Sequence, residues 1–152
     1  MAVGKKSARR RSRCPLNATL EAFGDGWSLL IVRDLMFKGR TMFKDFLDGE
    51  ERIATNILAD RLKKLEALGI IARERDASDA RRVRYRLTEK GLDLAPVLVE
   101  MIVWGARYED TDAPPRTIRC MTEDRDRFIA EIRKRWAAGE RGAVRSSPKS
   151  TS

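Results

Sequence analysis

The repeat of apolar residues changes at Gly69, and this change limits the fold more than any other feature of the chain. Over residues 54–68, leucine and isoleucine recur every three or four positions, which predicts an amphipathic helix that ends at Gly69. Beyond it, residues 71–75 and 83–87 alternate apolar and basic side chains, which predicts two strands. Residues 76–80 between them are mostly polar turn formers. The sequence therefore predicts a helix followed directly by a β-hairpin.

The hairpin is expected to have one apolar face and one basic face, because side chains alternate along a strand. The apolar face of the second strand carries Val83, Tyr85 and Leu87. The basic face carries Arg82, Arg84 and Arg86. The pattern is typical of a half-buried ribbon with a cationic outer edge.

Helical periodicity recurs on both sides of this unit. Helices are expected at 15–23, 27–37, 42–47 with Thr41 as its cap, 89–108 with a kink at Pro96, and 122–138, with a linker at 112–115. The helix at 89–108 carries two apolar stripes, so it needs a second burying surface. In a chain this small, another copy of the chain is the candidate. The residues expected at this dimer interface are Leu16, Leu20, Phe23, Leu92, Val99 and Ile102.

Positive charge is concentrated at the ends of the chain. The formal charge is +9, of which residues 1–13 carry +6 and residues 139–152 carry +2. Both ends are rich in Ser, Lys and Arg and poor in large apolar residues, which predicts disorder. A basic arm beside a nearly neutral domain indicates a polyanionic partner, usually nucleic acid, although a merely solvated tail has the same composition.

Composition excludes several function classes. Histidine is absent, which removes His-based triads, His metal ligands and the usual neutral-pH proton shuttle. Cys14 and Cys120 cannot form a disulfide framework, and no apolar run has the length of a membrane span or follows the basic N-terminus as in a secretory signal. We therefore expect a soluble cytoplasmic protein with no membrane association, no metal, no cofactor and no enzymatic activity.

The order of elements predicts a mainly α fold with a small β-hairpin wing, the winged helix-turn-helix. In this fold an exposed helix enters the DNA major groove, which is about 12 Å wide, and the wing contacts the adjacent minor groove or phosphates. The expected divisions are a disordered arm at 1–13, the DNA-binding domain with its dimerisation helix at 14–110, a linker and accessory helix at 111–138, and a disordered tail at 139–152.

Residues 14–109 resemble the HxlR-type winged-helix transcriptional regulators, relatives of the MarR family. The matching segments are Cys14-Pro15, GDGWSLLIVRDL at 24–35, RTMFKDF at 40–46, the helix at 53–69, and YRLTEKG at 85–91. The resemblance implies a homodimer, joined by its first and last helices, that binds double-stranded DNA at inverted repeats, mostly as a repressor or activator; repression is the expected direction. The segment beyond residue 112 lies outside the resemblance, and Ala54-Thr55 stands where many relatives have Ser-Pro.

Three groups of residues are candidates for contact with DNA. The face of the helix at 54–68 that is expected to enter the groove carries Thr55, Asn56, Ala59, Asp60 and Lys63, whereas Arg61 can instead turn inward toward an acid. The wing offers Arg81, Arg82 and Arg84, and the third helix offers Arg40, Thr41 and Lys44 as backbone clamps. Asparagine can bond adenine through two hydrogen bonds, and lysine reaches guanine or phosphate. The alternative is a set of ordinary solvated charges.

Cys14 is a candidate redox sensor, because some HxlR-type regulators sense electrophiles or oxidants through a cysteine at this place. Arg13 precedes it and a helix begins at Pro15, and both favour the thiolate. The alternative is a small buried residue at the dimer interface. Trp27 and Trp104 are expected as core and interface anchors, and the effector, if any, is not identified by the sequence.

Two other function classes fit the composition less well. A sequence-indifferent nucleic-acid-binding protein would depend on its basic tails, and removal of residues 1–13 would then abolish binding instead of leaving an operator preference. A small enzyme with Cys14 as nucleophile lacks a histidine or another evident general base.

Overall fold

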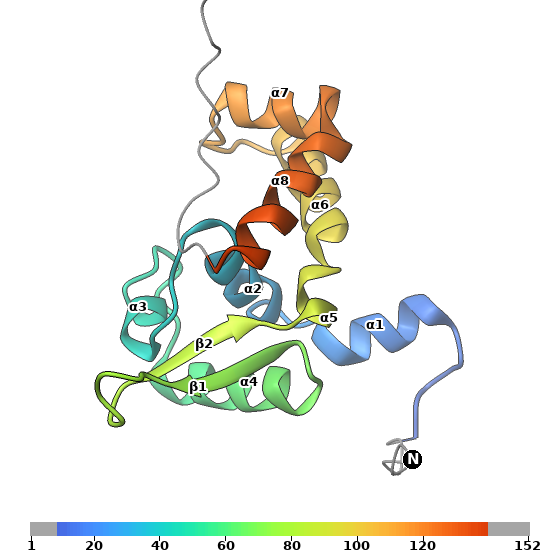
Figure 1. The fold of residues 1–152 in the computed structure, drawn as a ribbon. Helices are drawn as coiled ribbons and strands as arrows, with labels where there is room; N and C mark the ends of the chain where they lie inside the picture. The colour runs from blue at the N-terminus through green and yellow to red at the C-terminus, as the bar shows by residue number, and fades with distance from the viewer. Residues whose placement is uncertain (1–8, 140–152) are drawn as a thin grey trace, which may run out of the picture.

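The computed structural model describes residues 9–139, and Figure 1 shows how the helices surround a two-stranded hairpin. The arm and tail were expected to be disordered, and of these segments residues 1–8 and 140–152 lie outside the described part of the chain. In chain order the elements are α1 (Pro15–Phe23), α2 (Ser28–Phe37), α3 (Phe43–Leu47), α4 (Thr55–Ala67), β1 (Ile71–Arg75), β2 (Val83–Leu87), α5 (Glu89–Leu92), α6 (Ala95–Tyr108), α7 (Pro115–Glu123) and α8 (Arg125–Ala137). No helix among the described residues is long and apolar enough to cross a membrane.

The hairpin pairs as the alternation predicts. β1 and β2 are antiparallel, with Ile71 opposite Leu87 and Arg75 opposite Val83. On the far edge of β2, the Tyr85 amide donates a 2.7 Å hydrogen bond to the Thr41 carbonyl, so the segment before α3 holds the middle of β2. The predicted fold class is confirmed: the chain is mainly α with a hairpin wing, in the order of a winged helix-turn-helix.

The core lies between α2, α4, the base of the hairpin, and the long helix α6. Its fully buried side chains include Val32, Leu58, Leu62, Leu65, Ile71 and Val99. The leucines of α4 recur every three or four residues, so one stripe of this helix is buried and the opposite side stays in water. The periodicity that predicted α4 therefore also determines which of its faces is free.

The helix expected at 89–108 is two helices. α5 ends at Leu92 and α6 begins at Ala95, with Pro96 in its first turn. A proline nitrogen cannot donate to the carbonyl four residues earlier, and its ring clashes with that carbonyl, so Pro96 ends the helix at Leu92. Pro96 therefore causes a break, not the expected kink.

The accessory segment also differs from the expectation. Residues 112–114 lie between helices, as expected of the linker, but α7 begins already at Pro115, where no helix was expected, and the last helix begins at Arg125, not residue 122. In α8, Ile132 is buried in the common core and the Phe128 ring lies 6.2 Å from the Phe37 ring of α2. These two helices are thus packed against the domain, and they cover part of α6 that the sequence assigned to a partner.

Candidate nucleic-acid interface

The outer face of α4 consists of short polar and basic side chains. All five residues expected in the groove are exposed: Thr55, Asn56, Ala59, Asp60 and Lys63. Ala54 precedes the helix and provides no side-chain cap. Behind this face, Leu58, Leu62 and Leu65 are buried. The face offers an amide, a hydroxyl and an ammonium group at the spacing of one helix surface, which suits hydrogen bonding to base edges.

Arg61 turns inward, as the alternative for this residue anticipated. Its Nε donates to Asp25 Oδ1 at 3.1 Å, and its Nη1 donates to Asp60. Asp25 also accepts from the backbone amides of Trp27 and Ser28 and from the Ser28 hydroxyl. Burial opposes ionisation of Asp25, but these hydrogen bonds outweigh it and hold its pKa well below the ordinary value. The contact joins α4 to the start of α2.

A second contact holds α4 about one turn after Arg61. Lys64 Nζ donates to the Glu21 carbonyl of α1 at 3.3 Å. Lys64 is thus directed toward α1, whereas Lys63 has no ion-pair partner among residues 9–139. Two separate tethers, at Arg61 and Lys64, therefore set the orientation of the helix.

The arginines of the wing fall into two groups. Arg81 and Arg82 are exposed at the turn of the hairpin, where Arg82 makes only a 3.9 Å contact with Asp79. Arg84 is half-buried: its Nε lies 2.9 Å from Asp76 and its Nη1 donates to the Thr41 hydroxyl. Hydrogen bonds from the Ser78 hydroxyl and amide, together with Arg84, lower the pKa of Asp76. Arg84 therefore stabilises the wing instead of lying open for a phosphate, which corrects its expected role.

Two further wing arginines were missed by the sequence reasoning. Arg73 and Arg75 on β1 are exposed, and no ion pair involves either of them within the described part of the chain. Both lie on the same face of β1 as buried Ile71, opposite Tyr85 and Val83 of β2, so the alternation by itself gave no signal for two exposed cations there. The freely exposed charge of the wing thus comes from β1 and from the turn.

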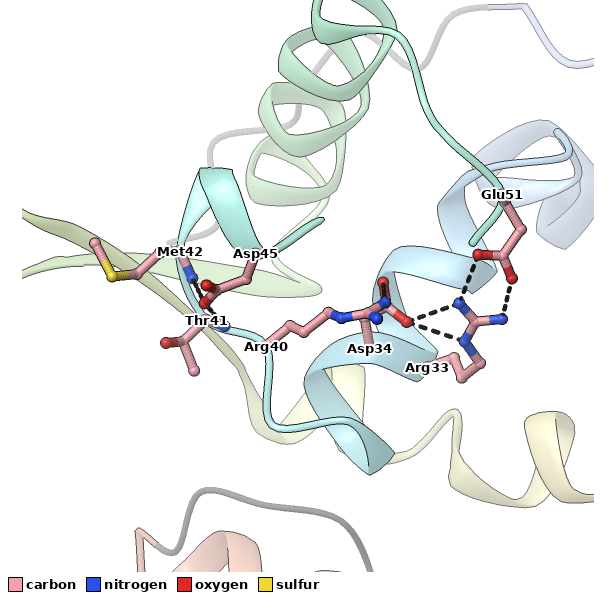
Figure 2. A network of polar contacts seen from close by, with 7 residues as sticks. All are labelled: Arg33, Asp34, Arg40, Thr41, Met42, Asp45 and Glu51. Carbon is pink, nitrogen blue, oxygen red and sulfur yellow. Dashed lines mark hydrogen bonds and ion pairs between the residues drawn. The ribbon is translucent and has the colours of Figure 1, made fainter. Parts of the chain in front are cut away.

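Two of the three clamp candidates, Arg40 and Thr41, are held within the protein (Figure 2). Arg40 Nη1 lies 2.9 Å from buried Asp34, so Arg40 is not a free cation, which corrects the expectation for it. The Thr41 and Met42 amides both donate to the Asp45 carboxylate, and the N-cap residue of α3 is Met42, one position after the expected Thr41. Lys44 alone of the three candidates is exposed.

The same network fixes the turn that precedes α4. Arg33 of α2 donates to both carboxylate oxygens of Glu51, at 2.5 and 3.1 Å, and to Asp34 (Figure 2). The hydrogen bond from Arg33 lowers the pKa of Glu51 to about 2, against a smaller opposite effect of burial. Arg52 next to it has φ of 53°, a conformation that L-residues rarely adopt. The Arg33–Glu51 pair therefore stabilises a strained turn.

The expected interface residues are divided by the structure. Leu16 and Leu20 of α1 are 66% and 50% exposed, and Phe23 and Ile102 are partly buried. Leu92 and Val99 are buried in the chain's own core and cannot reach a partner, because the second surface that α6 needed is partly supplied by α7 and α8. Leu92 and Val99 were therefore wrongly expected at the dimer interface. The apolar residues that α6 exposes are Val97, Met101, Trp104 and Tyr108.

The thiols differ in accessibility. Cys14 is exposed and immediately precedes α1, whereas Cys120 of α7 is half-buried. Among residues 9–139 no group of three His, Cys, Asp or Glu side chains is placed to hold a metal ion. Cys14 is therefore the more accessible thiol, within two residues of the exposed Leu16.

The chain is similar to known helix-turn-helix regulators. A family model described as HxlR-like helix-turn-helix matches residues 22–113. YdeP of Bacillus subtilis (strain 168), an uncharacterised HTH-type transcriptional regulator, is 34% identical over 97 residues, which are 64% of this chain and 75% of YdeP.

Solved structures are similar over the same share of the chain. PA1607, a candidate transcription factor, matches with a TM-score of 0.61 and 38% identity, over 68% of this chain and 71% of its own. The redox regulator HypR in its oxidised form matches with a TM-score of 0.58 and 30% identity, over 64% of this chain and 100% of its own.

Proposed function

The chain belongs to the HxlR-like helix-turn-helix family of transcriptional regulators, and from this premise we propose that it binds an inverted-repeat operator sequence-specifically as a homodimer. The observation that carries the proposal is the outer face of α4, on which all five expected groove residues are exposed beside the wing. A dimer bound across a promoter blocks access to it, so the proposed direction of control is repression. The proposed partner is double-stranded DNA.

Sequence is read by α4 in this proposal. Asn56 lies in the first turn and Lys63 two turns later on an exposed face, and both carry donors for base edges. Asp60 is bonded to Arg61, so its negative charge is partly neutralised where it would otherwise face phosphates. Thr55 and Ala59 present small side chains, which permit close approach to a groove floor or to a thymine methyl group.

The wing and Lys44 supply contacts to the DNA backbone. Arg81 and Arg82 at the turn, together with Arg73 and Arg75 of β1, present exposed guanidinium groups, and β1 packs against α4 (Figure 1). Charge of this kind strengthens binding to any duplex and makes it depend on salt. Arg40, Thr41 and Arg84 contribute indirectly, because each is bonded within the protein and positions the elements that carry the free charges.

The homodimer is proposed to form through α1 and α6. Leu16 and Leu20 are apolar and exposed, and α6 exposes Met101, Trp104 and Tyr108 in one stripe. The Trp104 and Tyr108 rings contact one another at 5.3 Å, so this stripe includes a contiguous aromatic surface. Exposed apolar surface of this kind marks a site of association.

Thiol modification is proposed as the control. Cys14 is exposed at the start of α1, beside the apolar residues of the proposed interface, and the similar protein HypR is described as a redox regulator. A modified or cross-linked Cys14 would shift one subunit against the other. Because a two-fold operator requires both recognition helices about 34 Å apart, such a shift weakens binding.

The test is selection of duplexes from a random pool by the full-length chain, followed by competition at fixed salt. Enrichment of a two-fold symmetric sequence, bound several orders of magnitude more tightly than bulk DNA, supports the proposal. A pool that remains random after repeated selection contradicts it. That result would favour a sequence-indifferent nucleic-acid binder that depends on its basic tails.

A further inference from the structure

Trp136, near the end of α8, contacts the base of the wing. Its indole Nε1 donates a 2.9 Å hydrogen bond to the Leu87 carbonyl, and the Arg86 guanidinium lies 5.5 Å from the centre of its ring. Both partners belong to β2. We propose that Trp136 is a positioning residue that sets the direction of the wing on DNA, an inference that rests on the proposed DNA-binding function.

The position of Trp136 is fixed because α8 is anchored independently of the wing. Phe128 contacts Phe37 of α2, and Ile132 is buried in the core. The exposed pair between Arg133 and Asp93, 2.8 Å apart, joins α8 to the residue after α5. Trp136 thus extends a rigid support to β2, and in Figure 1 the end of α8 lies next to that strand.

The wing needs such a support because two strands alone make a weakly stable unit. The middle of β2 is held at Tyr85 by Thr41, and the base of β2 is held at Leu87 by Trp136. Ile71 and Leu87 also anchor the base of the wing in the core, and these two hydrogen bonds to the backbone of β2, two residues apart, add to that anchor and fix the direction of the strand. From Leu87 to Arg82 the strand extends about 16 Å, so a turn of about 10° at the base would displace the tip by about 3 Å, the length of a hydrogen bond.

This support lies outside the matched family region. The family model ends at residue 113, whereas α8 spans Arg125–Ala137. The contact of Trp136 with β2 is thus a feature of the segment that this chain adds to the family domain. Its proposed effect is on the wing, so it should change the contribution of the wing arginines and leave base reading by α4 unchanged.

The test is a double-mutant cycle on a mixed-sequence duplex of about 30 base pairs, enough for two half-sites. Trp136→Ala is expected to weaken binding several-fold in the wild-type protein, by no more than is lost in a wing-neutral variant, Arg73→Ala/Arg75→Ala/Arg81→Ala/Arg82→Ala, which removes the exposed wing arginines of β1 and the turn. In that wing-neutral variant, Trp136→Ala should have almost no further effect. In Asn56→Ala, the full loss should persist, because α4 does not depend on Trp136.

Two further variants separate positioning from loss of folding. Trp136→Phe keeps an aromatic ring under Arg86 but lacks the N–H donor, so it should lose less affinity than Trp136→Ala. Arg133→Ala removes only an exposed ion pair, which contributes little, and leaves Phe128 and Ile132 to anchor α8, so this variant should bind DNA as wild type does. Amide hydrogen exchange should accelerate in β1 and β2 of Trp136→Ala while α4 stays protected.

The outcomes are distinct. An equal loss from Trp136→Ala in the wild-type and wing-neutral proteins, or unchanged exchange in the hairpin, overturns the positioning role alone. If the wing-neutral variant binds as tightly as wild type, the wing has no part in DNA binding, and the wing contacts of the proposed function fail together with this inference.

Discussion

The Arg61 guanidinium of α4 lies 3.1 Å from Asp25 Oδ1, in the turn between α1 and α2. Asp25 accepts at the same time from the amides of Trp27 and Ser28, so one carboxylate caps α2 and holds α4. The Asp25 side chain therefore links the two helices, although Asp25 and Arg61 are 36 residues apart in the sequence. The proposed recognition helix depends on this contact for its angle.

Replacement of Asp25 should destabilise the domain. Asp25→Ala removes a helix cap and leaves Arg61 half-buried with only Asp60 as a partner, so we expect a loss of about 1–2 kcal/mol. Asp25→Asn keeps an acceptor and should lose less. Urea unfolding of both variants measures the difference. An unchanged midpoint for Asp25→Ala would contradict the capping role.

The Arg33–Glu51 pair should make stability depend on acid. The pKa of Glu51 is about 2 in the folded protein against an ordinary value of 4.5, so the unfolded chain binds the proton more tightly. The stabilisation is complete above pH 4.5 and is lost as the pH falls toward 2. The difference in unfolding free energy between wild type and Glu51→Gln should therefore shrink over this range. A difference that stays constant down to pH 2.5 would exclude the pair as its source.

Variants of α4 and of the wing should affect DNA binding in different ways, because α4 is proposed to read bases and the wing to contact the DNA backbone. Asn56→Ala is expected to lose about 1–3 kcal/mol of discrimination at particular base pairs. Arg82→Ala should weaken all duplexes alike and reduce the slope of log affinity against log salt by about 1. Binding titrations at several salt concentrations measure both effects. Full sequence preference in Asn56→Ala would mean that α4 is not oriented as proposed.

The two faces of α6 should respond differently to charge. Met101→Asp places a carboxylate on the exposed stripe, so it should produce a folded monomer by removing apolar contacts and desolvating a charge. Val99→Asp places the same charge in the chain's own core and should unfold the domain. Sedimentation measures the association state, and circular dichroism measures the folding. An unaltered dimer for Met101→Asp, or a monomeric wild type, contradicts the proposed interface.

Cys14 should react with thiol reagents faster than Cys120, because it is exposed at the start of α1 and Cys120 is half-buried. If Cys14 controls DNA binding, oxidation with diamide should weaken binding in wild type, and Cys14→Ser should bind DNA and resist the oxidant. Mass spectrometry of labelled peptides gives the two rates. The switch is falsified if Cys14→Ser loses binding under diamide as wild type does.

The sequence by itself determined the type and order of the elements around the hairpin, because helical and strand periodicity, glycine stops and proline starts act within a few residues. The same local rule identified the exposed face of α4, since Leu58, Leu62 and Leu65 define its buried stripe. The inward turn of Arg61 was open as an alternative for the same reason: its position lies at the edge of that stripe.

Only the tertiary structure decided which neighbours those faces meet. Leu92 of α5 and Val99 of α6 are in the chain's own core, and α7 and α8 pack against α6, whereas no periodicity within α6 distinguishes a cover from the same chain from a cover by a partner. Arg40 and Arg84, which were expected to contact DNA, instead form ion pairs with Asp34 and Asp76 for a related reason. The sequence around an arginine does not show whether its side chain is solvated or forms an ion pair. That depends on which acidic side chains the fold brings within about 3 Å of it.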